Sequence, residues 1–403
     1  MERTSRRQFL AGGALIAAAA VGAGGIALSA RGTRTTGAAA PAPAKPLRKL
    51  LDIGTGGVIE PGSAQDLRMA GNPGYFVETG TRWIRMWADW PSLQPSADHA
   101  PDDPLNPAAH KLRALDEQIA LANRLGIRVM LMPYRFPRWA NGTEDGARGP
   151  RDQAPEYRLP ARAYDHHGAW AAFFGFLHDR YHAGRESGPR VAGFELVNEP
   201  NLQLWPQPGV PREVAQLLKT AQGISARSAH STRLYAPSIS DDDAPSSERH
   251  TRWDEFVPAL LGELEAIGYL PHSGQAWSHH NYTDVEKRQT QTRSQAIRAL
   301  LKGRWGGHVE GEAPTVFITE GGARLSRMPD LYPREDPREA QARCLRDAWA
   351  LHERPDGPGA GVAMFAQYLL YADPNFDCGL LDPFPSTVKR PAYEAWRAFP
   401  VYA

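Results

Sequence analysis

The chain has 403 residues, and its 46 Lys and Arg against 45 Asp and Glu give a formal net charge of +1. A hydrophobic share of 42% is enough for a large buried core. The near-neutral balance gives no electrostatic reason to expect nucleic acid or an anionic membrane as the main partner, and it favours a neutral substrate.

The first 45 residues have the features of an export leader rather than of a folded domain. Arg6 and Arg7 precede a hydrophobic residue, an arrangement that resembles a twin-arginine signal, and a mildly apolar run rich in Ala and Gly follows at 11–28. An Ala/Pro tract at 38–44 has the composition of a flexible linker. We expect residues 1–45 to be a twin-arginine signal peptide and linker. The Tat export machinery would be a partner in transit, and the mature protein would be secreted without stable membrane insertion. An uncleaved membrane anchor is the alternative.

From residue 46 to residue 403, short apolar runs alternate with amphipathic stretches. The runs that we interpret as strands are 49–54, 81–87, 128–132, 191–197, 233–236, 276–282, 315–319 and 361–367. The helical patterns are 109–125, 164–183, 211–229, 253–267, 286–303, 337–353 and 390–398. Such alternation is typical of a parallel sheet. Eight units predict an α/β fold, a (β/α)₈ TIM barrel in a single catalytic domain, with a doubly wound open sheet as the alternative.

Two glutamates follow predicted strands. Glu199 lies in an Asn-Glu-Pro motif after the fourth strand, and Glu320 lies in a Thr-Glu-Gly motif after the seventh. In such barrels the carboxyl ends of the strands meet at one rim, where the chemistry takes place. Paired carboxylates cleave glycosidic bonds, since one protonates the leaving oxygen while the other attacks or activates water. Glu195 is expected to be a paired structural residue inside the barrel.

These two motifs resemble those of the clan A glycoside hydrolases, and segment 194–205 is especially similar to families 39 and 5. The resemblance implies a retaining O-glycoside hydrolase that cleaves β-glycosidic bonds of a polysaccharide or oligosaccharide. In such an enzyme Glu199 would be the catalytic acid/base and Glu320 the nucleophile. The supporting residues that it implies are Arg85 beside the nucleophile, Asn198 at the sugar 2-hydroxyl, His280 at the sugar or acid/base, and Tyr282 at the nucleophile.

Aromatic residues near the predicted strand ends suit the apolar faces of sugar rings. We expect Trp139, in a segment that resembles the Pro-x-Trp-Ala of several clan members, and Trp205 to bind the carbohydrate substrate. The chain departs from the clan in two places. Tyr134 stands where family 5 often has histidine, and Gln367 or Tyr368 stands where the eighth strand often carries tryptophan.

Neither a cofactor nor a metal is expected, because the chain has no His-x-His or His-x-x-Glu-His spacing. Two alternatives remain open: a catalytically inactive sugar-binding barrel, and a metal-dependent isomerase or lyase barrel. The only two cysteines, Cys344 and Cys378, exclude a disulfide scaffold. They either pair with each other or remain free thiols.

Overall fold

The computed structural model describes residues 47–53, 66–67, 72–143, 149, 153–160, 168–205, 209–228, 232–248, 250–269, 275–290, 292–305, 315–354 and 361–401. The expected leader, residues 1–45, lies outside these ranges, so the export signal stays a prediction. None of the helices within the described ranges has both the length and the apolar character needed to span a bilayer.

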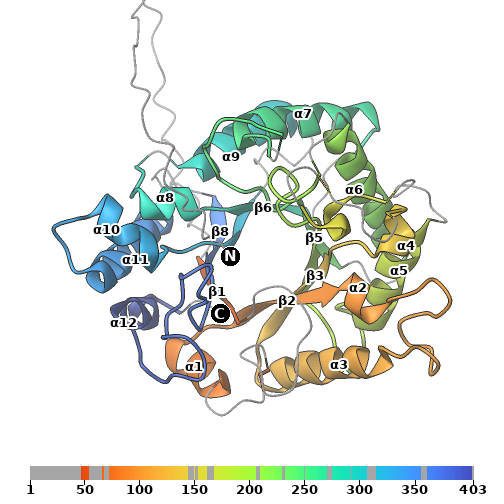
Figure 1. Ribbon diagram of the computed structural model, residues 1–403, viewed down its shortest axis with the longest axis horizontal. Helices are drawn as coiled ribbons and strands as arrows, with labels where there is room; N and C mark the ends of the chain where they lie inside the picture. The colour runs from red at the N-terminus through yellow and green to blue at the C-terminus, as the bar shows by residue number, and fades with distance from the viewer. Residues whose placement is uncertain are drawn as a thin grey trace, which may run out of the picture. The chain divides into compact units, whose positions relative to one another are not determined.

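Eight parallel strands form a closed barrel in chain order, and the last strand pairs back onto the first (Figure 1). The strands are β1 (Arg48–Asp52), β2 (Trp83–Asp89), β3 (Arg128–Tyr134), β4 (Gly193–Glu195), β5 (Arg233–Tyr235), β6 (Gln275–His280), β7 (Val316–Glu320) and β8 (Val362–Gln367). Closure excludes the open sheet, because an open sheet has two edge strands, whereas each strand here pairs with a neighbour on both sides. The single-domain (β/α)₈ TIM barrel is therefore confirmed.

The helices lie outside the ring of strands (Figure 1). The longer ones are α1 (Asn72–Thr79), α3 (Ala109–Arg124), α5 (Ala169–Tyr181), α6 (Val210–Arg227), α7 (Trp253–Ala266), α9 (Arg293–Trp305), α11 (Pro337–Glu353) and α12 (Pro391–Ala398). The short ones are α2 (Trp90–Leu93), α4 (Arg138–Asn141), η2 (Pro155–Tyr157), α8 (Tyr282–Glu286), η3 (Leu325–Arg327) and α10 (Met328–Leu331). The short helices all lie in segments that follow β2, β3, β6 or β7, and they shape the loops at the carboxyl ends of these strands.

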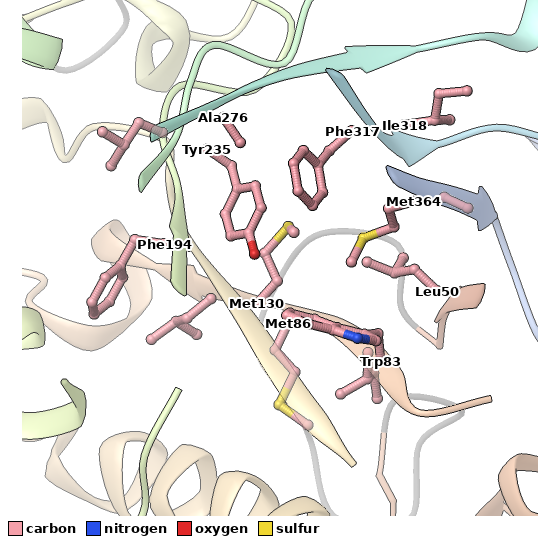
Figure 2. Packing of buried hydrophobic residues seen from close by; sticks show 14 of the residues in the cluster. Leu50, Trp83, Met86, Met130, Phe194, Tyr235, Ala276, Phe317, Ile318 and Met364 are labelled. Carbon is pink, nitrogen blue, oxygen red and sulfur yellow. The ribbon is translucent and has the colours of Figure 1, made fainter. Parts of the chain in front are cut away.

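The interior of the barrel is filled by side chains. Figure 2 shows part of this packing, with Leu50, Trp83, Met130, Tyr235, Phe317 and Met364, all of which are buried. Strands that are covered on both faces read as continuous apolar runs, which is why the sequence revealed them. A packed interior leaves the two ends of the barrel as the places where a ligand can bind.

The two cysteines are both free and both buried. Cys344 lies on α11, and Cys378 lies in the segment that follows β8. The sequence left open whether the two cysteines pair or remain free, and the structure has them as free thiols.

Candidate active site

Glu199 and Glu320 meet at the carboxyl end of the barrel. Glu320 is the last residue of β7, and Glu199 lies four residues beyond β4, in a segment that Asn198 ties to Ser238 by a parallel bridge. Both side chains are buried, and one carboxylate oxygen of each lies within 4.8 Å of the other. Retaining glycosidases hold their carboxyl groups about 5–5.5 Å apart, whereas inverting enzymes need a gap of about 6.5–9.5 Å.

The backbone around Glu199 adopts a sterically costly conformation. Val197 and Glu199 have φ angles of 61° and 41°, in the left-handed region that residues with a Cβ rarely occupy. Such conformations persist only where the surrounding structure holds them, and they are common at functional sites. Here they turn the chain so that the Glu199 side chain lines the cavity.

Arg85, in the middle of β2, links the carboxylates below the cavity. Its fully buried guanidinium donates to Glu320 Oε1 and to Glu195 Oε2, and it lies 3.6 Å from Asp52. Its Nη2 also donates to Asn198 Oδ1 at 2.7 Å. Burial by itself lowers the pKa of Arg85, but the surrounding carboxylates Glu195, Glu320 and Asp52 raise it above its ordinary value. Glu195 is thus the paired interior residue that the sequence predicted.

His280 and Tyr282 complete the surroundings of the two glutamates. His280 Nδ1 lies 2.9 Å from Glu199 Oε1 and 3.5 Å from Glu320 Oε2, and the Tyr282 hydroxyl donates to Glu320 Oε2 at 2.9 Å. A register shift between His279 and His280 interrupts β6, and Tyr282 begins α8 rather than ending the strand as predicted. Burial lowers the pKa of His280, but Glu320 and Glu199 raise it by more.

Sequence reasoning missed Gln203. Its Nε2 donates to Glu199 Oε2 at 3.0 Å, so both oxygens of Glu199 have a protein partner. Its backbone N–H also bonds to the Glu199 carbonyl at 2.8 Å, which places it one turn after the glutamate. That spacing of four residues, within the same motif, was the signal that could have identified it.

A cavity of about 690 Å³ opens above the two glutamates. One wall is aromatic: Trp87 packs edge-on to Tyr134 with centroids 4.0 Å apart, and the Tyr134 and Tyr157 hydroxyls are 2.7 Å apart. The other wall is polar and includes Asp241–Asp243, Lys287, Arg324 and Arg327. Buried N–H groups of Asn198 (Nδ2) and Trp87 (Nε1) have no hydrogen-bond partner among the described residues, and both residues line the cavity. The cavity therefore offers an aromatic face together with free donors, which suits a polyhydroxylated ligand.

The two positions that depart from the clan pattern also lie at this end. Tyr134 is part of the aromatic wall. Tyr368 lines the cavity, while Gln367 is buried and donates to the Cys378 carbonyl at 2.8 Å. Of the two candidates after β8, Tyr368 is therefore the one that reaches the cavity.

Trp139 and Trp205 do not line this cavity. The Trp139 indole donates to the Gln94 carbonyl at 3.0 Å and packs edge-on to Trp90, and the Trp205 indole donates to the Ala154 carbonyl at 2.9 Å. Both polar edges thus bind backbone of neighbouring loops. A role for these two residues in sugar binding stays a prediction.

One group of described side chains could in principle hold a metal ion. Ligand atoms of Glu199, His280 and Glu320 all lie within 4.8 Å of one another. However, Glu320 already accepts hydrogen bonds from Arg85 and Tyr282. A guanidinium on the same carboxylate would repel a cation and compete for its ligand. The arrangement fits an ion-paired carboxylate better than a metal ligand.

Comparisons with known proteins identify the fold. No family model and no curated protein matches the chain. Among solved structures, a family 39 glycoside hydrolase from Bacteroides cellulosilyticus WH2 aligns with a TM-score of 0.53 and 13% identity, over 88% of this chain and 63% of that one. A glucosidase from Croceicoccus marinus aligns with a TM-score of 0.56 and 13% identity, over 89% of this chain and 68% of that one. A GH5_18 protein from Streptomyces cattleya, solved in complex with GlcNAc, aligns with a TM-score of 0.52 and 15% identity, over 89% of this chain and 83% of that one.

This chain thus spans less than two thirds of the family 39 protein, and the identities are low. What the likeness establishes is a (β/α)₈ barrel of the kind found in glycoside hydrolases.

Proposed function

We propose that the protein is a retaining O-glycoside hydrolase that cleaves β-glycosidic bonds of an oligosaccharide or polysaccharide by double displacement. The observation that carries the proposal is the pair of buried glutamates, Glu199 and Glu320, with carboxylate oxygens within 4.8 Å at the carboxyl end of the barrel. That separation leaves too little room for a water between a carboxylate and the sugar, so direct attack is favoured over inversion.

In the first step, a Glu320 oxygen forms a bond to the anomeric carbon while the bond to the leaving oxygen breaks. Glu199 gives its proton to that oxygen and becomes a carboxylate. In the second step, Glu199 takes a proton from water, whose oxygen displaces Glu320 from the anomeric carbon. Two inversions give net retention of configuration. Arg85 and Tyr282, which donate to opposite oxygens of Glu320, would fix its orientation.

His280 and Gln203 would position Glu199, the residue that transfers the proton. They engage opposite oxygens of Glu199, which fixes the plane of its carboxyl group toward the leaving oxygen. The free Nδ2 of Asn198 would donate to a sugar hydroxyl next to the anomeric centre, where a contact that strengthens in the transition state speeds the reaction.

The deciding experiment is a panel of aryl β-glycosides and β-glycans, with the anomeric configuration of the first product followed by proton NMR. A β-configured product that later mutarotates supports the proposal. An α-configured first product would show inversion and would remove the nucleophile role from Glu320, and no hydrolysis of any substrate would favour a sugar-binding barrel.

A metal-dependent reaction is the second candidate, because ligand atoms of Glu199, His280 and Glu320 lie within 4.8 Å of one another, but the hydrogen bonds from Arg85 and Tyr282 to Glu320 weigh against it. The two proposals differ in their response to a chelator. We expect hydrolysis to be unchanged after prolonged dialysis against EDTA. A loss of activity that zinc or manganese restores would instead support the metal-dependent alternative.

We also propose that the protein is exported through the twin-arginine pathway, on the strength of Arg6 and Arg7 alone. Replacing both with lysine should retain the protein inside the cell, whereas Arg3→Lys, a matched change in the same segment, should not. Equal secretion of the two variants would refute the proposal.

A further inference from the structure

A second cavity, of about 720 Å³, lies at the opposite end of the barrel. Its lining includes the first residues of four strands: Arg48 of β1, Trp83 of β2, Arg128 of β3 and Arg233 of β5. Because these strands are parallel, their first residues belong to the amino-terminal end, away from Glu199 and Glu320. None of the residues assigned to the glycosidase reaction lines this cavity.

The described lining residues of this cavity carry positive charge only. Arg48, Arg128, Arg190 and Arg233 line it, and no Asp or Glu is among its described lining residues. Arg128 and Arg233 lie against aromatic rings, with their guanidinium carbons 5.6 Å from the Trp83 centroid and 5.8 Å from the Phe317 centroid. Aromatic faces orient guanidinium groups but do not cancel their charge. Over the described part of the chain, none of the four arginines has a carboxylate partner.

Polar atoms inside the cavity also lack partners. The Tyr235 side chain is fully buried, and Figure 2 shows its hydroxyl pointing into the interior of the barrel. Arg233 interacts with that hydroxyl strongly enough to lower its pKa, but the oxygen has no hydrogen bond of good geometry among the described residues. Arg48 Nε is likewise buried without an acceptor. A buried donor without an acceptor is costly, so a ligand or water that accepts from it would be favoured here.

The groups that line the cavity change one another's pKa values. The pKa of Arg48 is lowered, first by burial and further by Arg128 and Arg233, while Tyr235 acts in the opposite direction. Burial raises the pKa of Tyr235, and Arg233, Arg48 and Arg128 each lower it. Arg48, Arg128 and Arg233 thus line one cavity and influence the same hydroxyl.

We propose that this amino-terminal cavity is a binding site for a polyvalent oxyanion of the phosphate class. A guanidinium presents its N–H groups as a planar fork that matches phosphate oxygens, and several forks around one point suit an anion with more than one negative charge. A neutral sugar would leave the positive charge uncompensated. The volume exceeds that of a single phosphate, so a diphosphate or a phosphate ester fits.

Inorganic pyrophosphate is the probe that tests the site. Binding to the full chain is measured by isothermal titration calorimetry at constant ionic strength, because exposed charges are screened by salt. The variant that combines Arg48→Gln, Arg128→Gln and Arg233→Gln should bind at least about tenfold more weakly than the wild type. Its hydrolysis of an aryl glycoside should be unchanged, which shows that the barrel is intact.

The matched control combines Arg113→Gln, Arg212→Gln and Arg346→Gln, which removes three exposed arginines from α3, α6 and α11. It changes the net charge equally, and we expect pyrophosphate binding within about twofold of the wild type. Should the first triple variant fail to fold, Arg233→Gln and Tyr235→Phe singly should each weaken binding several-fold. Lack of pyrophosphate binding by the wild type, or equal weakening in both triple variants, would overturn the proposal.

Discussion

Arginine side chains have different surroundings at the two ends of this barrel. At the carboxyl end, Arg85 is fully buried, and Asp52, Glu195 and Glu320 surround it. At the amino end, the arginines of β1, β3 and β5 share a cavity whose described lining has no carboxylate. A buried charge stabilises the buried charges of opposite sign around it, so its removal is costly. A charge that is partly exposed to water needs no protein counter-charge. Changes at the carboxyl end should therefore be severe, and matched changes at the amino end mild.

The largest expected effect is the loss of Glu320. Glu320→Ala should lower kcat by more than about 10⁴-fold, since removing a nucleophile removes the reaction path. External azide should restore part of the activity and give a glycosyl azide of inverted configuration. Glu199→Ala should still react with substrates that have good leaving groups, because these need no proton, and azide should then give the retained product. Equal azide products from both variants would contradict the assigned roles.

The next effect concerns stability. Arg85→Met removes the buried counter-charge of Glu195 and Glu320, so we expect a loss of about 3–5 kcal/mol in the free energy of unfolding. The matched change at the other end, Arg233→Met, should leave stability nearly unchanged. Urea unfolding followed by circular dichroism measures both. Similar losses for the two variants would show that the contrast between the two ends is mistaken.

A smaller effect should define the extent of the sugar-binding surface. Tyr157→Ala removes part of the aromatic wall, and we expect substrate binding to weaken several-fold, since a stacked aromatic contact contributes about 1 kcal/mol. Trp139→Ala and Trp205→Ala, whose indoles lie outside the cavity, should have less effect on KM. If these two variants weaken binding as much as Tyr157→Ala, the subsites extend past the cavity and the sequence prediction for both tryptophans holds.

The smallest effect is a dependence of stability on pH. The pKa of His280 is raised in the folded protein, because Glu320 and Glu199 outweigh the effect of burial. A histidine of this kind stabilises the fold fully below its unfolded pKa of about 6.5, and the contribution disappears as pH rises through the folded pKa. His280→Gln should therefore abolish a decline in stability above about pH 6.5. The exposed His110→Gln serves as the control, and an unchanged pH profile for His280→Gln would contradict the prediction.

The eight strands could be predicted because each is a short apolar run that is buried on both faces. Glu199 and Glu320 could be found because each follows such a run, and parallel strands end at one rim. Helix α1 was missed because Asn72, Pro73 and Gly74 open a short segment that has no helical apolar repeat.

Contacts between distant loops could not be predicted. Tyr157 reaches the cavity through η2, a three-residue helix whose position depends on packing rather than on any periodic pattern. The directions of Trp139 and Trp205 depend on the backbone carbonyls that their indoles bind. The arginine cavity was missed for another reason. Arg48, Arg128 and Arg233 are far apart in sequence, and only closure of the barrel brings the first residues of alternate strands to one level.

The carboxylates around Arg85 have a consequence for selectivity. Even with a proton on Glu199, three buried carboxyl groups, Asp52, Glu195 and Glu320, face one guanidinium. For the proposed glycosidase, these carboxyl groups would favour the positive charge that develops on an oxocarbenium-like sugar ring. We therefore expect uncharged sugars to bind in the central position more readily than a uronic acid or a sulfated sugar, whose negative charge would lie next to the same carboxyl groups.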